Sequence, residues 1–213
     1  MEPDRETRLQ ILLEELDATR EHIAGYGAAR ARLMNGSALV MITLFLLGYT
    51  AWLPMAILLL PFAALYAVVH LAVLTACSRF ARAHAAGLEE RINIEAGGPL
   101  LFDQALASRT LGPTGRSSFF GITAENITSI LSWSTLHFLA ISAALYLAGF
   151  LRARYLLADE VDTLPVGTLA DVYVPVLALW TLINLGYLIW YFLVANPEKS
   201  LAEAIRKHYQ KGE

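Results

Sequence analysis

The feature that most constrains the fold is a run of forty-one residues, Ser37 to Cys77, without a single Asp, Glu, Lys or Arg. A bilayer core of roughly 30 Å is crossed by about 20 apolar residues in a helix, so the run is long enough for two spans. The turn between them is expected near Pro54, because a proline in the first turn of a helix loses no backbone partner. The run therefore predicts a transmembrane helical hairpin over residues 36–77.

Two further apolar blocks predict a third span, 124–150, and a fourth span, 172–195. Thr123 suits the N-cap of the third span. Charged residues make up only 16% of the chain, against about 25% in soluble domains, and they cluster between the apolar blocks. We therefore expect an all-α integral membrane protein with four transmembrane helices and a cytosolic layer of amphipathic helices.

The polar segments divide the chain into five regions. They are a cytosolic amphipathic helix at 1–35, the hairpin at 36–77, a cytosolic helix extension and loop at 78–123, spans three and four at 124–195 with a short external loop at 151–171, and a cytosolic C-terminal helix at 196–213. Leu9, Leu12, Leu13, Leu16 and Ile23 recur on one face of the first helix. Its other face is mainly acidic, which favours packing on the chain's own loop or on a second copy over an anionic lipid surface.

Local signals predict where the helices break or bend. Asn35-Gly36 is a possible break before the first span, and Gly97-Gly98-Pro99 should end the helix that continues span two. Pro61 lies inside the second apolar block, where an internal proline tends to kink a helix.

The distribution of Lys and Arg predicts the orientation. Fourteen of these sixteen residues lie in the N-terminal segment, the 78–126 segment and the tail, and only Arg152 and Arg154 lie on the opposite side. Positive residues are retained on the cytoplasmic side, so both termini are predicted to be cytoplasmic. The Arg- and Ala-rich composition suggests a bacterial protein, and hence the bacterial inner membrane.

Span three carries a polar stripe that is the main candidate for function. Helical spacing places Thr128, Ser132, Thr135 and Ser142 on one face, with Ser134 and His137 on the adjacent face beside alanines 140, 144 and 148. One interpretation is a wet path with His137 as a proton-sensitive gate. The interpretation we prefer is close helix packing, in which small residues let backbones approach and hydroxyls bond across helices.

Asn184 lies about half-way along span four, and an unpaired amide in hydrocarbon is costly. His137 lies about half-way along span three, so we expect the two side chains to pair. This predicts that spans three and four are neighbours and that His137 faces protein. His70, in span two, is expected to be a packed histidine.

Several function classes are disfavoured by what the sequence lacks. Apart from Glu125 at the very start of span three, the predicted spans contain no Asp, Glu, Lys or Arg, whereas coupled transporters usually hold a carboxylate within the membrane. The five histidines lack the i, i+3 or i+4 spacing of a helical metal site, and no nucleophile motif is present. A net charge of −3 argues against a nucleic-acid partner. We therefore expect no enzymatic activity, no cofactor and no metal.

These considerations favour a non-enzymatic membrane protein that acts through assembly. Its expected partners are the lipid bilayer and either a second copy or another membrane or cytosolic protein, bound through the cytosolic layer. The alternative is a small oligomeric channel whose pore is lined by the stripe of span three.

The orientation predicts the behaviour of reporter fusions. Alkaline phosphatase, which is active only outside the cytoplasm, should be active when fused after Leu157 and silent when fused after Gly112. Activity at Gly112, or silence at Leu157 with normal expression of the fusion, would show that the orientation is wrong.

Overall fold

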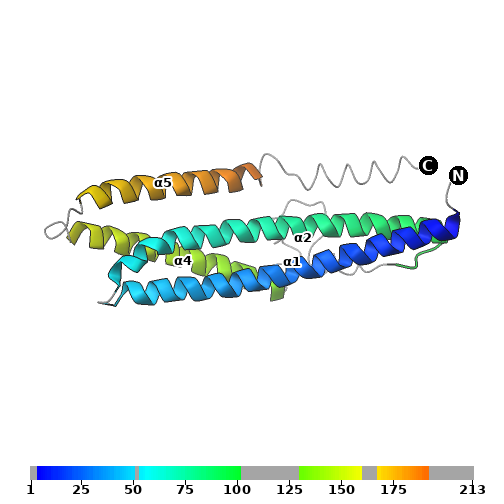
Figure 1. Ribbon diagram of the computed structural model, residues 1–213, viewed down its shortest axis with the longest axis horizontal. Helices are drawn as coiled ribbons and strands as arrows, with labels where there is room; N and C mark the ends of the chain where they lie inside the picture. The colour runs from blue at the N-terminus through cyan, green and yellow to red at the C-terminus, as the bar shows by residue number, and fades with distance from the viewer. Residues whose placement is uncertain (1–3, 51–52, 102–129, 160–166, 192–213) are drawn as a thin grey trace. The chain divides into compact units, whose positions relative to one another are not determined.

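The structure is a computed structural model that describes residues 4–50, 53–101, 130–159 and 167–191 (Figure 1). These residues form α1 (Arg5–Gly48), the 3₁₀ helix η1 (Pro54–Leu59), α2 (Leu60–Ala96), α4 (Ile130–Asp159) and α5 (Gly167–Ile189). By length and composition, four helical stretches in this part of the chain are apolar enough to cross a membrane. The expected all-α architecture with four such helices is confirmed.

The chain divides into two compact units. The polar unit comprises Met1–Arg30, Val73–Ser134 and Phe192–Glu213, and the apolar unit comprises Ala31–Ala72 and Thr135–Tyr191. Helices α1 and α2 each contribute one part to the polar unit and another to the apolar unit.

The polar unit is held by an apolar seam between α1 and α2. Leu16, Ala85, Leu88 and Ile92 are buried, and Leu9, Leu12, Ile23 and Leu101 pack against them. The amphipathic first helix therefore packs on its own chain, along the extension of span two. Leu13 is the exception among the five predicted apolar positions, since 45% of it is exposed.

The N-terminus of α1 and the C-terminus of α2 are both capped. The Thr7 N–H donates to Asp4 Oδ1 at 2.9 Å, which makes Asp4 the N-cap of α1. Hydrogen bonds from the Thr7 side chain and backbone lower the pKa of the Asp4 carboxyl. At the C-terminus of α2, Gly97 has φ of 80°, and the Gly97 and Gly98 N–H groups donate to Ile94 and Asn93 carbonyls. This is a Schellman motif, so α2 ends where the glycines predict.

No break occurs at Asn35-Gly36, because α1 is continuous from Arg5 to Gly48. The Ser37 hydroxyl donates to the Leu33 carbonyl at 2.6 Å across this point. An Asn and a Gly together cost only about 1–2 kcal/mol of helix propensity, which continued hydrogen bonding on both sides can offset.

In the apolar unit, the hairpin turn is tight. α1 ends at Gly48, and a Cβ added there would lie 2.6 Å from the Ile57 Cβ, so only glycine fits this approach. Pro54 lies in the first turn of η1, as predicted. The expected mid-helix kink at Pro61 is wrong, because α2 begins at Leu60 and Pro61 lies in its first turn, where the missing N–H costs nothing.

The loop predicted at 151–171 is too long. α4 continues to Asp159, so Arg152 and Arg154 are helical, and α5 begins at Gly167. Ala153, Leu156 and Leu157 are buried, and this packing extends the helix beyond the apolar block that defined span three. The predicted Thr123 cap and the C-terminal helix at 196–213 lie outside the described residues.

The seam of the polar unit predicts unequal effects of two leucine substitutions. Leu88→Ala leaves a cavity against Leu16 and should lower the free energy of local opening by about 2–5 kcal/mol. Leu13→Ala removes a side chain that is 45% exposed and should change it by only about 0.5 kcal/mol. Hydrogen-exchange mass spectrometry of residues 5–23 in the full chain measures both. Equal protection in the two variants would contradict the seam.

Candidate functional site

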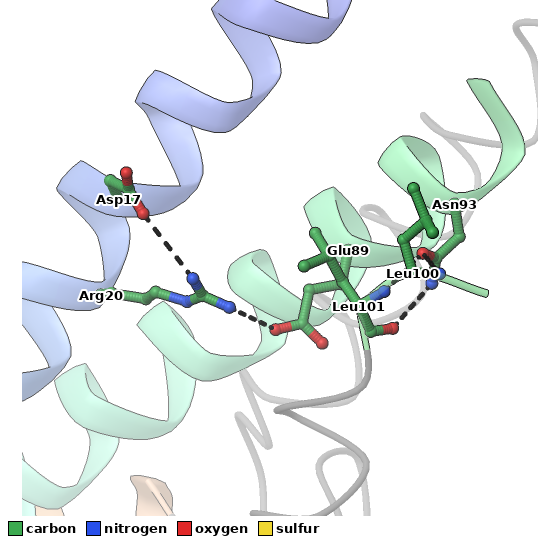
Figure 2. Close-up of polar contacts among 6 residues, drawn as sticks. All are labelled: Asp17, Arg20, Glu89, Asn93, Leu100 and Leu101. Carbon is green, nitrogen blue, oxygen red and sulfur yellow. Dashed lines mark hydrogen bonds and ion pairs between the residues drawn. The ribbon is translucent and has the colours of Figure 1, made fainter. Parts of the chain in front are cut away.

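Among the described residues of the polar unit, the most deeply buried charge is Glu89 on α2, which is 4% exposed. Arg20 on α1 reaches it with Nη2 at 3.5 Å from Glu89 Oε1, and its Nη1 lies 3.6 Å from Asp17 Oδ1. Figure 2 shows the Arg20 guanidinium between the two carboxylates. Because a buried carboxylate needs a charged or hydrogen-bonding partner, this pair fixes how the two helices face each other.

Two further polar contacts join α1 to α2. The Arg5 guanidinium donates through Nε to the Glu95 carbonyl at 2.7 Å, and Nη2 donates to the same oxygen. Glu15 Oε1 and His84 Nε2 lie 3.1 Å apart. Asn93 anchors the segment after the helix, since its Oδ1 accepts from the Leu100 and Leu101 N–H groups at 2.8 Å (Figure 2).

Three arginines lie near the points in the sequence where the polar unit gives way to the apolar unit. Arg30 comes from α1, Arg79 and Arg82 come from α2, and all three are partly buried. Burial lowers the pKa of the Arg30 guanidinium. Burial, followed by the positive charges of Arg30 and Arg79, lowers the pKa of Arg82. Arg82 is therefore within electrostatic reach of both Arg30 and Arg79.

In the apolar unit, the polar stripe of α4 is a packing face. Thr135 is fully buried and Ser142 is 1% exposed. Gly149, seven residues further on, is so close to α2 that an added Cβ would lie 3.0 Å from Pro61 Cδ and 3.2 Å from Leu60 Cβ. Residues seven apart lie on the same side of a helix, so a seven-residue repeat can stay in contact with one neighbouring helix. The close approach at Gly149 agrees with one part of the packing interpretation. The other part, hydroxyls bonded across helices, is not seen at Ser142, whose buried Oγ has no hydrogen-bond partner among the described residues.

The adjacent face of α4 is directed outward. Ser134 and His137 are exposed, as are alanines 140 and 144 of the series predicted to be a close-packing face. His137 was expected to face protein, and this stays a prediction, since its side chain is exposed while α4 turns its Thr135–Ser142 side inward. Thr128 lies outside the described residues, as does the side chain of Ser132.

Helices α4 and α5 are neighbours, as predicted, but a different pair of side chains joins them. The Tyr146 and Thr181 hydroxyl oxygens lie 2.7 Å apart and share a hydrogen bond. Asn184 Nδ2 donates to the Trp180 carbonyl of its own helix at 2.7 Å. The Asn184 amide donor therefore needs no acceptor on another helix. The pairing of Asn184 with His137 stays a prediction, but the need to satisfy this donor no longer supports it.

Aromatic contacts place α5 against the beginning of α2. The ring centroid of Phe62 lies 6.0 Å from that of Tyr173 and 6.2 Å from that of Trp180. The Tyr173 hydroxyl donates to the Leu58 carbonyl at 3.1 Å. This bond satisfies a polar group at the point where η1 passes into α2.

One polar pair of α2 is directed away from the other helices. His70 is stacked on Tyr66 with ring centroids 5.1 Å apart, and both side chains are exposed. His70 was expected to be packed. Its side chain is instead exposed, and it stacks on Tyr66, which lies four residues earlier in the same helix.

The sequence contained signals for two of the residues that its analysis missed. Glu89 follows Leu88 and lies four residues after Ala85, so a helical projection places it beside the buried seam. Gly149 continues the seven-residue spacing of Thr135 and Ser142. By contrast, no spacing rule connects Tyr146 with Thr181, because their contact depends on the register between α4 and α5.

The part of the chain that the structure describes offers no candidate metal site. There, no three His, Cys, Asp or Glu side chains are grouped to hold a metal ion.

The packing face predicts that two glycines of the spans respond differently to alanine. Gly149→Ala should lower the stability of the detergent-solubilised protein by about 1–3 kcal/mol, because the added Cβ overpacks the contact with Leu60 and Pro61. Gly186→Ala is the matched control, since no described atom lies within 4 Å of its added Cβ. Thermal unfolding followed by circular dichroism compares them. A Gly149→Ala midpoint at or above that of Gly186→Ala would rule out the close contact.

No protein-family model, no curated protein and no solved structure matches this chain. Its own contacts therefore supply the only basis for a functional proposal.

Proposed function

We propose that this chain is a non-enzymatic, four-span membrane protein that acts through assembly, as a homo-oligomer or as a subunit that binds a partner. In this proposal the four apolar helices cross the bacterial inner membrane, and the polar unit, with both termini, forms a cytosolic layer. The observation that carries the proposal is the outward-facing pair of Tyr66 and His70 on α2.

The depth of this pair explains why it favours assembly. His70 and Tyr66 lie seven and eleven residues before Cys77, where the apolar run ends, or about 10 Å and about 16 Å into the apolar layer. Hydrocarbon supplies no hydrogen-bond partner for a phenol or an imidazole. Polar side chains at this depth usually face protein or water, so a neighbouring subunit is the expected cover.

The polar unit offers a second surface for a partner. Its exposed apolar side chains include Ile11 at 53% and Leu13 at 45% on α1, Phe80 at 55% and Ile94 at 61% on α2, and Leu100 at 67% just after α2. Single exposed apolar residues are common on soluble surfaces, so these positions do not identify a binding surface by themselves. They are compatible with a partner whose contact surface is partly apolar.

The exposed face of α4 favours a second candidate function. Ser134 and His137 are directed outward, and in a ring of subunits they could line a small pore. Thr135 and Ser142 do not fit such a pore, because they are buried within the single chain. Flux through liposomes separates the candidates: a leak above empty liposomes that His137→Leu alters would favour the channel.

The assembly proposal predicts a change in mass on substitution of the outward pair. The wild-type protein in mild detergent should be larger than a monomer, or should carry a partner, by light scattering or native mass spectrometry. The double variant Tyr66→Phe/His70→Leu should weaken association by about 3- to 30-fold, which corresponds to one interhelical polar contact.

Leu182→Ala is the control, because Leu182 is a 70% exposed apolar residue on α5 and suits contact with lipid. It should leave the mass distribution unchanged. A wild-type protein that is strictly monomeric and has no bound partner would remove the assembly proposal.

A further inference from the structure

One guanidinium of the apolar unit is held against two tyrosine rings. The Arg152 Cζ atom of α4 lies 5.4 Å from the ring centroid of Tyr49, which directly follows α1. It lies 5.3 Å from the ring centroid of Tyr155, which is three residues further along α4. These are the distances of cation–π contacts. Arg152 is half-buried, whereas each tyrosine is 58% exposed, so the group lies at the surface of the unit.

The backbone around this group is fixed by two close contacts. A Cβ added at Gly48, at the end of α1, would lie 2.6 Å from the Ile57 Cβ of η1. A Cβ added at Gly149, three residues before Arg152, would lie 3.2 Å from the Leu60 Cβ of α2. The end of α1 and the last turns of α4 are therefore both packed against the junction of η1 and α2. This packing, rather than a chance meeting of two long side chains, brings the guanidinium to the ring of the other helix.

The structure gives Arg152 no anionic partner. Its buried Nε atom has no hydrogen-bond acceptor, and no carboxylate among the described residues forms an ion pair with it. Residues 31–72 and 135–158 contain no Asp or Glu, and Asp159 lies seven residues further on, about 10 Å of helix. Cation–π contacts replace only part of the hydration that a half-buried charge has lost. An anion at the remaining N–H groups of Arg152 is therefore favoured.

The place of the group in the sequence indicates where this anion comes from. Tyr49 lies in the turn between the first two spans, and Arg152 follows the apolar block of span three by two residues, about 3 Å of helix. The interfacial layer of a bilayer extends roughly 5–8 Å beyond the hydrocarbon, and tyrosine is enriched there. With the spans inserted as proposed above, the guanidinium lies at the level of the lipid phosphates.

We propose that Arg152, Tyr49 and Tyr155 form a binding site for the phosphate diester of an anionic phospholipid. A guanidinium that is stacked on rings keeps the N–H groups at its edge, and these bind phosphate oxygens with two parallel bonds. The two phenol hydroxyls, which have no partner among the described residues, are additional donors.

The same contacts favour an anionic headgroup over a zwitterionic one. Arg152 repels the ammonium of a zwitterionic headgroup, and the ring faces that would attract this ammonium are already in contact with the guanidinium. The inference rests on the membrane insertion in the proposed function, but it depends neither on assembly nor on which side of the membrane the site faces.

The test uses the full chain, delipidated in a neutral detergent and titrated with phosphatidylglycerol, phosphatidylcholine or diacylglycerol. Native mass spectrometry measures the lipid that is retained. Wild type should retain phosphatidylglycerol best and diacylglycerol, which has no phosphate, least. Arg152→Gln should weaken retention of phosphatidylglycerol about tenfold, as expected for the loss of one charge-assisted contact. Equal retention of diacylglycerol and phosphatidylglycerol by wild type would overturn the site.

Arg154→Gln is the matched control. It removes the same charge from the same helix two residues away, but Arg154 is exposed and has no ring contact or ion pair among the described residues. Retention of phosphatidylglycerol should fall less than about threefold, in line with a general surface attraction that salt screens. Equal losses for Arg152→Gln and Arg154→Gln would show that only net charge matters, and the site would be overturned.

Two further variants keep the test decisive if Arg152→Gln does not fold. Arg152→Lys keeps the charge but loses the planar fork, so it should retain phosphatidylglycerol less well than wild type. Tyr49→Phe/Tyr155→Phe keeps both rings and removes only the hydroxyls, so its thermal midpoint should match that of wild type. Its retention should fall about three- to tenfold. Retention at the wild-type level in both variants would contradict the proposal.

A free anion and the failure of assembly are distinguished from failure of the site. Inorganic phosphate at matched ionic strength should displace phosphatidylglycerol only weakly, because it lacks the acyl chains that anchor the lipid. Tight binding of phosphate with no retained lipid would assign the group to a soluble anion and overturn the lipid site. The reporter fusions test insertion and the mass of each variant tests assembly, so loss of lipid selectivity alone counts against this inference and not against the proposed function.

Discussion

The close contact of neighbouring helices with α2 is the interaction on which the rest of the structure depends. In its most apolar window 44% of the residues are buried, against 11–22% in the windows of the other three spans. In the apolar unit, Gly149 of α4 and the aromatic rings of α5 meet the beginning of this helix. In the polar unit, Leu88 and its neighbours receive the apolar face of α1. Among the polar groups of this helix, the buried Glu89 and the exposed Tyr66 and His70 are the most informative.

The surroundings of these polar groups differ along α2. Glu89 is buried where Arg20 of α1 can pair with it. This ion pair favours one register and orientation of α1 on α2, whereas apolar contacts alone would let the two helices slide. Tyr66 and His70 are exposed, and within a bilayer only another protein or water could satisfy them. The assembly proposal follows from this contrast between the paired Glu89 and the exposed Tyr66 and His70.

The polar stripe of α4 illustrates how a pattern can be correct while its meaning depends on packing. The common face of Thr135 and Ser142 was predicted from helical spacing alone, and both residues are buried. Spacing could not show which side of α4 turns inward, because hydroxyl and alanine faces are both compatible with close packing. The contact of Gly149 with Leu60 and Pro61 decided it, and this left His137 on the outer side.

The sequence by itself determined the helical class, the number of apolar helices and several of their ends. Uncharged length, the place of Pro54 and the glycines after Ala96 act locally, through hydrocarbon thickness and backbone geometry, so one chain read in order suffices. The tertiary structure alone decided which α4 face packs, that Tyr146 meets Thr181, and that Asn184 bonds to its own helix. These features depend on register between helices that are distant in sequence. Periodicity defines faces within one helix but carries no information about which face of another helix they meet.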